Sequence, residues 1–284
     1  MALVLVSALL IAGWAWGQTV AGSITGRVED SSGGVIPNAK VTLTQVATGQ
    51  TRAVTTNARG EFVAPLMPIG AYEVAARYQG FKTELRSGII LHVDETVSLR
   101  MILQPGSTRQ SVQVVSAAPL LETRTYSLGQ VILNNQVLNM PLNGRNIFQL
   151  GLLTGYTTPV SGMGTNQTFA GGGGRFSGNN ILLDGISDNT TATNGSIGRN
   201  GYLYTPSVDA VQEFKVTTSD FSAEFGHAAG SLVSVAIKAG TNHFHGDLFE
   251  FLRNNAFDAN NFFSNSANQP ISPFRRSQFG GTLG

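Results

Sequence analysis

The chain has 284 residues, enough for two modest domains, and carries a formal net charge of +1. Only 12% of its residues are charged, against about a quarter in an average soluble domain. With 34 glycines, this composition favours an all-β protein outside the cytoplasm over a cytosolic enzyme. The absence of cysteine excludes disulfides, thiolate zinc sites, iron–sulfur clusters and cysteine nucleophiles. The near-neutral charge gives no support to a nucleic-acid partner, which a clustered basic patch would indicate.

The N-terminus predicts export. Residues 2–12 form an apolar run of the length of a signal-peptide core, too short to span a bilayer as a helix. Small residues stand at −3 and −1 of a cleavage before Gln18, and cleavage after Ala21 is the alternative. No Lys or Arg precedes the run, so either the start codon is misplaced or the first residues are missing. We expect residues 1–21 to be a signal peptide; a buried N-terminal strand is the other interpretation.

Short apolar–polar alternations separated by Gly, Asn and Pro turns fill residues 23–104. Ile24 and Val28 belong to the first such run, and Leu99 and Met101 belong to the last. About seven strands in roughly eighty residues, without helical periodicity, predict a small antiparallel sandwich.

Beyond a linker at 105–108, the sequence predicts short helices among strands. Asn134 or Asn135 caps a brief helix that Pro141 ends, and a second helix is expected from about Arg145 to Leu153.

A third short helix is expected from Asp209 to Phe214, with Ser207 as its cap. The loops at 161–180 and 187–203 are long for a compact domain, which indicates a functional surface or partial disorder.

The C-terminal residues predict amphipathic strands. Residues 231–236 read as one strand, and in 276–284 Phe279 and Leu283 alternate with polar residues and glycine. Strands of this kind joined by Asn- and Gly-rich loops are a weak signature of a membrane β-barrel, which needs at least about eight strands. Since the tail has room for two or three strands of roughly ten residues, we expect a truncated chain.

The N-terminal region resembles the carboxypeptidase regulatory-like domain, a transthyretin-like sandwich. The residues that carry the resemblance are G-S-I-T-G-R-V-E-D-S-S-G-G-V-I-P-N-A-K-V-T-L at 22–43, T-N-A-R-G-E-F at 56–62 and L-M-P-I-G-A-Y-E-V at 66–74. The resemblance implies an accessory sandwich over 22–104. It implies no peptidase activity, because a domain of this kind is an accessory and does not itself carry the catalytic site. We therefore expect no enzyme and no cofactor.

The following region resembles the plug domain of TonB-dependent outer-membrane transporters, especially the Oar-like receptors. The motifs are M-P-L-N-G-R-N-I-F-Q-L at 140–150, N-N-I-L-L-D-G-I at 179–186, P-S-V-D-A-V-Q-E-F-K-V-T-T-S-D-F-S-A-E-F-G at 206–226 and A-G-S-L-V-S-V-A-I-K-A-G-T-N at 229–242. The resemblance implies a plug over 108–240 and the start of a truncated barrel over 241–284.

In this family a short extended segment, the TonB box, is captured by TonB as an added strand. The candidate here is apolar and β-prone, with backbone groups suited to pairing with a sheet edge. It consists of Ser111, Val112, Gln113, Val114 and Val115. The alternative is that this segment is the first strand of the plug.

The plug motif supplies further candidate residues. They are Asn143, Gly144, Arg145, Asp184, Gly185, Glu213, Glu224 and Gly226. Arg145 is interpreted as a bridge from plug to barrel wall, or else as part of a cap and turn. Asp184-Gly185 is a strand-ending turn, with ligand contact at the plug apex as its functional interpretation.

Two other patterns fail as sites. Gly171–Gly174 with Arg175 lacks both the Gly-Lys-Ser/Thr and the G-x-G-x-x-G spacing of phosphate loops. His243 and His245 share one face of an expected strand, but no third ligand is nearby, so we expect no metal.

The sequence therefore predicts the N-terminal part of an outer-membrane transporter or receptor whose plug gates uptake driven by TonB. Its expected partners are TonB with the inner-membrane energising complex, outer-membrane lipid, and a small-molecule, glycan or peptide ligand; the N-terminal sandwich is expected to be periplasmic. The alternative is a secreted β-sandwich protein that binds carbohydrate or protein in adhesion and has no transport activity.

Overall fold

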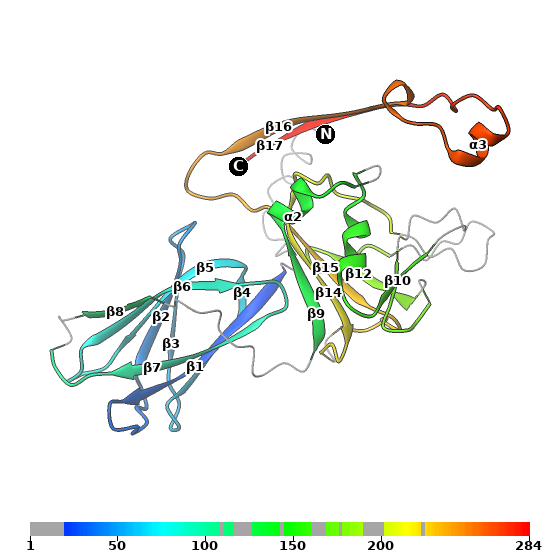
Figure 1. Ribbon diagram of the computed structural model, residues 1–284. Coiled ribbons are helices and arrows are strands. Elements are labelled where there is room, and N and C mark those ends of the chain that lie inside the picture. Colours follow the sequence, from blue (N-terminus) through cyan, green and yellow to red (C-terminus); the bar gives the residue numbers. More distant parts are fainter. Residues whose placement is uncertain are drawn as a thin grey trace, which may run out of the picture.

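The structure is a computed structural model that describes residues 20–107, 111–115, 127–142, 145–160, 169–175, 178–189, 202–222 and 225–284. It is mainly β, as predicted, and has three parts: an N-terminal sandwich, a middle unit and a C-terminal hairpin (Figure 1). The sandwich and the middle unit each have a hydrophobic core of their own. The expected signal peptide lies almost wholly outside the described residues. Ala21, which the alternative cleavage would remove, is the first residue of strand β1 and pairs with Pro68.

The sandwich consists of a three-stranded sheet in the order β4-β1-β7 and a five-stranded sheet in the order β3-β2-β5-β6-β8. The strands are β1 Ala21–Asp30, β2 Lys40–Gln45, β3 Thr51–Thr55, β4 Glu61–Pro68, β5 Gly70–Arg77, β6 Thr83–Leu91, β7 Thr96–Leu103 and β8 Ser111–Val115. The strand count predicted for 23–104 is thus confirmed. The wholly antiparallel pairing is corrected, because β1 pairs with β7 and β6 pairs with β8 in parallel.

The core of the sandwich lies between the two sheets. Alternate side chains of each strand point inward, as Val41 and Leu43 do in β2, and both are fully buried. Gly26 in β1 lies against the buried ring of Phe62, where an added Cβ would come within 2.6 Å of the ring. A larger residue there would push the neighbouring strands apart, which explains the glycine inside a strand.

The middle unit is built on a five-stranded mixed sheet in the order β13-β12-β15-β14-β9. Its elements are β9 Leu128–Leu133, α2 Asn134–Asn139, η3 Ile147–Leu153, β10 Thr157–Pro159, β11 Phe169–Gly171, β12 Asn180–Leu183, β13 Ile186–Ser187, β14 Val211–Ser219 and β15 Leu232–Ile237. The strand predicted at 231–236 is confirmed as β15. Strand β14 lies between β15 and β9, and most of its side chains are buried. The core gathers Phe148 of η3 against Phe214 and other apolar side chains of the sheet.

The first two predicted helices exist with different details. Helix α2 begins at Asn134, but the side chain that satisfies its first turn is that of Gln136, whose Oε1 accepts from the N–H of Leu133 at 3.1 Å. Asn134 Nδ2 instead donates to Val211 O at 2.6 Å and joins the helix to β14. The second helix is a 3₁₀ helix, η3, that begins at Ile147 after the cap residue Asn146.

The third predicted helix is wrong. Val211 and Phe214 belong to β14, and Ser207 Oγ accepts from the N–H of Ala210 at 3.3 Å in the turn that precedes the strand. The β-bulge between Val211 and Glu213 interrupts the alternation at the start of the strand. It leaves Val211 and Phe214 three residues apart in the sequence, which is a helical spacing.

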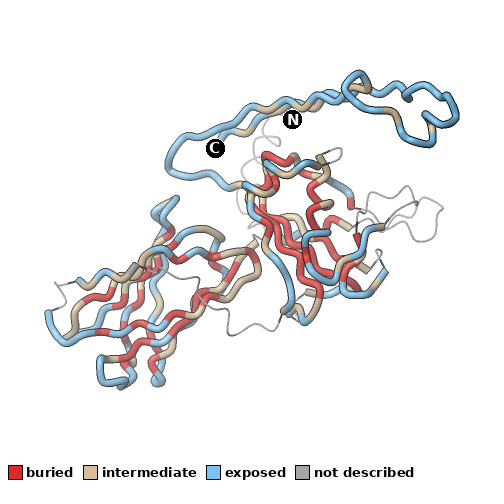
Figure 2. Tube along the Cα trace, in the orientation of Figure 1, coloured by how far each residue is buried: buried red, intermediate tan, exposed pale blue. Residues whose placement is uncertain are grey.

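The hairpin pairs β16, Gly246–Asn254, antiparallel with β17, Arg275–Leu283, over nine residues of each strand. The Asn-rich loop between them holds the short helices η5, Asn255–Phe257, and α3, Phe262–Ser266. Asparagine side chains cap both helices, which is the turn chemistry that this composition predicts. Figure 2 shows that the hairpin is exposed along its length, whereas buried strands run through the other two parts. Among the described residues, no helix has the length and apolar content needed to cross a bilayer.

Candidate functional site

The hairpin has two chemically different faces. Because side chains alternate along a strand and the register pairs Glu250 with Phe279, one face is mostly apolar. Its large apolar side chains, which are between 56% and 93% exposed, are Leu248, Leu252, Phe279 and Leu283. Polar and charged side chains also lie on this face, namely those of Glu250, Asn254, Arg275 and Ser277. Glu250 Oε1 accepts from Ser277 Oγ at 3.2 Å.

The opposite face of the hairpin meets the middle unit through polar contacts. Thr282 Oγ1 of β17 donates to Asp209 Oδ2 at 2.9 Å. Lys238 Nζ lies 3.6 Å from Asp209 Oδ1 and 3.6 Å from Asp247 Oδ2 of β16, so it bridges the two carboxylates. Asp209 is buried, which makes these contacts less screened than an ordinary surface pair. Phe249 and Phe251 share this face, so the hairpin turns a mixed polar and aromatic face inward. It turns its most exposed apolar side chains outward.

Arg145 adds an aromatic contact to the same junction. Its Cζ lies 3.9 Å from the ring centroid of Phe251 in β16, which is a cation–π arrangement. Arg145 has a φ of 57°, so the backbone there takes the left-handed conformation that a turn requires. The structure thus places this predicted residue against the hairpin as well as in a turn.

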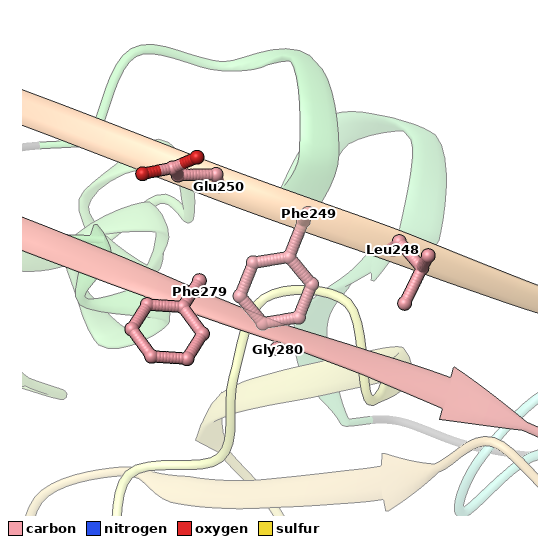
Figure 3. Close-up of a pocket in the computed structure, with 5 residues that line it drawn as sticks. All are labelled: Leu248, Phe249, Glu250, Phe279 and Gly280. Carbon is pink, nitrogen blue, oxygen red and sulfur yellow. The ribbon is translucent and has the colours of Figure 1, made fainter.

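An open depression runs along the hairpin rather than an enclosed cavity. It is lined by Leu248, Phe249, Glu250, Phe279 and Gly280 (Figure 3). The ring of Phe249 lies across β17 at Gly280, where an added Cβ would stand 2.7 Å from the ring. The glycine therefore lets an aromatic ring cover the neighbouring strand.

Asp184 and Gly185 form the predicted turn after β12, with φ values of 47° and 81°. Asp184 Oδ1 accepts from Ile237 N at 3.0 Å, and the Asp184 N–H donates to Val235 O at 2.9 Å. These bonds extend the pairing of β12 with β15 past the end of the strand. The carboxylate thus has a place in the sheet, and ligand contact at this turn stays a prediction.

The remaining plug-motif residues are dispersed. The carbonyl of Gly226 accepts from Asn180 Nδ2 at 2.8 Å and ties its loop to β12. Asn143, Gly144 and Glu224 lie outside the described residues.

The candidate coupling segment is strand β8, and it belongs to the sandwich. It pairs in parallel with β6, from Thr83 opposite Ser111 to Ser87 opposite Val115. The alternative interpretation, the first strand of the plug, is wrong, because the sheet of the middle unit begins with β9. In the part of the chain that the structure describes, β8 is an edge strand, and no other strand pairs with its outer edge.

Glu213 in β14 is bound by the sandwich. The turn at 92–95, between β6 and β7, brings Val93 N within 2.7 Å of Glu213 Oε1 and His92 Nδ1 within 2.8 Å of Glu213 Oε2. Lys215 Nζ donates to the carbonyl of Asp94 in the same turn at 2.9 Å. The hydrogen bond to Glu213 is the largest influence on His92 and raises the pKa of its imidazole against the opposing effect of burial.

Sequence reasoning singled out Glu213 and missed its partners in the turn. The available signal was a pair of charged residues, Glu213 and Lys215, that alternate with Phe214 and Val216, since buried charges are rarely left unpaired. The position of the partners, some 120 residues earlier in the chain, could not be read from spacing.

A second contact joins the sandwich to the segment between β15 and β16. Asn242 Nδ2 donates to Thr48 O at 2.7 Å, and its backbone N–H donates to Ala47 O at 3.1 Å. The sandwich thus touches both the central sheet of the middle unit and the connection to the hairpin.

The histidines of that connection are not on a strand. His243 and His245 precede β16, and His245 Nδ1 lies 2.9 Å from the carbonyl oxygen of His243. The expectation that they share a strand face is therefore wrong. Within the described ranges, no group of three or more His, Asp or Glu side chains is arranged to hold a metal ion.

Comparison with known proteins finds a matching domain family for each of two regions, one near each end of the chain. The carboxypeptidase regulatory-like domain family matches residues 23–104, and an outer membrane β-barrel domain family matches residues 236–284. The TonB-dependent transporter Oar of Myxococcus xanthus is 24% identical over 203 residues, which are 70% of this chain and 18% of that protein. The chain is similar to the Oar-like TonB-dependent transporters. The resemblance predicted from the sequence is thereby confirmed, and both the transporter and the barrel match indicate the outer membrane.

The chain spans less than a fifth of the length of the curated relative that it matches. Among solved structures, the TIE protein of Bacillus anthracis is 20% identical and covers 30% of this chain and 17% of its own, with a TM-score of 0.26. Catechol 1,2-dioxygenase from Pseudomonas arvilla is 13% identical and covers 38% of this chain and 60% of its own, with a TM-score of 0.28. Structural similarities with TM-scores this low support no conclusion about function.

Proposed function

We propose that the chain carries the periplasmic sandwich, the plug and the first barrel strands of a TonB-dependent outer-membrane transporter or receptor. The observation that carries the proposal is the two-faced hairpin, with apolar side chains outside and Asp247 and Thr282 inside against the middle unit. A strand of a transmembrane barrel needs an apolar face toward lipid and a polar face toward the lumen. The middle unit, which begins with β9 at Leu128 rather than at residue 108, occupies the lumen side and is the plug.

The contacts between plug and hairpin suit a gate. They consist of the Asp209–Lys238–Asp247 bridge, the bond from Thr282 and the ring contact of Arg145. Partly exposed ion pairs of this kind contribute about 1 kcal/mol or less each. A modest input of work therefore separates the plug from the wall, while the core of the plug stays folded.

Strand β8 is where TonB would act. None of the described strands pairs with its outer edge, to which an incoming strand adds as a sixth member of the five-stranded sheet. By this proposal TonB, driven by its inner-membrane complex, engages residues 111–115 and displaces the plug. A small-molecule, glycan or peptide ligand then passes.

Export through residues 1–21 would place the sandwich in the periplasm, where TonB reaches it. Cleavage before Gln18 is the better of the two sites, because it leaves all of β1 in the mature protein.

Cysteine cross-linking tests the coupling, since the chain has no cysteine of its own. Single substitutions Ser111→Cys and Gln113→Cys, in a strain whose TonB carries one cysteine in its periplasmic domain, are expected to give a disulfide-linked product. Ser32→Cys, an exposed position in the turn after β1, is the matched control and should give none. Equal cross-linking at all three positions, or none at 111 and 113, would contradict the proposal.

A further inference from the structure

Glu213 is a carboxylate that the middle unit alone cannot satisfy. It is 5% exposed, in a strand whose residues are nearly all buried. Burying a carboxylate without partners is costly, so its hydrogen bonds decide whether this arrangement is stable. The two bonds that the structure gives it, from Val93 N and from His92, both come from the sandwich.

Lys215 repeats the arrangement with opposite charge. It stands two residues after Glu213, so both side chains lie on the same face of β14. It is 6% exposed, and its Nζ donates to the carbonyl of Asp94. One turn of the sandwich therefore satisfies a buried anion and a buried cation on one strand of the middle unit.

The turn is held in shape before it docks. Glu95 Oε2 accepts from the N–H of His92 at 2.8 Å, and the carbonyl of Glu95 accepts from Ser23 N at 2.8 Å. Asp94 has a φ of 50°, the left-handed conformation that a tight turn requires. Partners fixed in advance lose little conformational entropy when they bind.

We propose that the turn 92–95 and the pair Glu213 and Lys215 form a latch that seats the sandwich on β14 and loosens as the pH rises. The latch goes beyond the proposed transport, because its contacts need neither TonB nor a ligand. Strand β6 ends at Leu91, immediately before the turn, so the strand that pairs with β8 leads directly into the latch. A displacement of β8 would therefore move β6 and the turn 92–95, and with them the contacts to β14.

The pH dependence follows from the charges around His92. The groups that face it are Glu213 and Glu95, which favour the imidazolium, and Lys215, which opposes it. The pKa of His92 is raised when the sandwich is docked on β14. The stabilisation that His92 gives to docking is therefore complete below the pKa of the undocked histidine, and it is lost as the pH rises through the pKa of the docked histidine. The bonds from Val93 and Lys215 persist over that range. The latch therefore loosens without opening fully.

Distance measurements on the full chain in detergent micelles test the latch. Spin labels at Val63→Cys on the sandwich and Thr158→Cys on the middle unit, both exposed, report the distance between the two parts. We expect one narrow distance distribution at about pH 6 that broadens by about pH 9. Glu213→Gln should broaden it at both values, whereas His227→Gln, which removes an exposed histidine, should change nothing.

A distribution that stays equally narrow in Glu213→Gln at both pH values would overturn the latch. The pH dependence of the latch would be overturned if the distance distribution of the labelled protein with Glu213 intact stayed the same from about pH 6 to about pH 9 while NMR showed that His92 titrates. Should Glu213→Gln lose its folded circular dichroism spectrum, Lys215→Met tests the second half of the latch. We expect Lys215→Met to broaden the distance distribution and to leave the dependence of that distribution on pH in place. A distribution as narrow as that of the labelled protein with Lys215 intact would count against the latch.

Discussion

The sandwich and the hairpin use the same strand pattern with opposite results. In β2 of the sandwich the apolar set, Val41 and Leu43, is fully buried beneath a second sheet. In β17 of the hairpin the apolar set, Phe279 and Leu283, is exposed, and the polar face meets protein. Alternation therefore decides which side chains share a face, and the neighbouring part of the molecule decides which face is covered.

The largest expected effect contrasts two phenylalanines across this difference. Phe62→Ala removes a side chain that is 2% exposed in the sandwich core, and we expect unfolding of the sandwich to cost about 3–5 kcal/mol less than in the parent. Phe279→Ala, on the outer face of the hairpin, should change the free energy of unfolding in detergent by less than about 0.5 kcal/mol. Urea titration monitored by circular dichroism of the β-strands measures the free energy of unfolding of both variants.

Equal losses for the two variants would break the comparison, because they would show that the outer face of the hairpin is packed against protein. A conservative control, Phe62→Leu, should lie between Phe62→Ala and the parent.

A smaller loss is expected from a buried polar residue of the middle unit. Asn179 is 6% exposed; its Oδ1 accepts from Ser231 Oγ at 2.9 Å and its Nδ2 donates to Phe169 O at 2.9 Å. Asn179→Leu has similar volume but leaves those groups unpaired, so we expect a loss of about 2–3 kcal/mol. Hydrogen exchange of the β15 amides should rise in this variant and stay at the parent level in the sandwich. Exchange that rises equally in both units would contradict their separate cores.

A smaller effect than that of Asn179→Leu is expected at the plug–hairpin junction. Asp209→Asn keeps an acceptor for Thr282 but removes the charge that faces Lys238, which we expect to cost about 0.5–1 kcal/mol. The loss should appear as faster motion of a spin label at Gln278 and should shrink at high salt. Leu248→Asn, on the outer face, is the control that should leave the label unchanged; an equal response to both would argue against an inward polar face.

Local patterns predicted most strands but not how they pair. The seven strands of 23–104 and the turn at Asp184 follow from alternation and turn residues that lie close together in the chain. Strand β15 follows from its short run of β-prone apolar residues. The helix expected at 209–214 failed because a β-bulge between Val211 and Glu213 interrupts the alternation there and leaves Val211 and Phe214 at a helical spacing. The place of β8 could not be predicted, since its β-prone residues suit the edge of either sheet and only the geometry of β6 selects one.

In the candidate site, too, the sequence predicted individual residues but not the partners that they contact. The sequence singled out Glu213 and Arg145, but their partners, His92 and Phe251, lie in other parts of the molecule. Long-range contacts of single side chains leave no periodic signal in the chain.

The orientation of the hairpin is the central claim, and lipid quenching tests it most directly. Single fluorescent labels at Leu248, Phe279, Asp247 and Gln278 are introduced into the protein in outer-membrane vesicles that contain brominated lipid. The account predicts strong quenching at Leu248 and Phe279 and little at Asp247 and Gln278, following the two faces of the strands. Quenching that is uniform at all four positions, or strongest at Asp247 and Gln278, would contradict it.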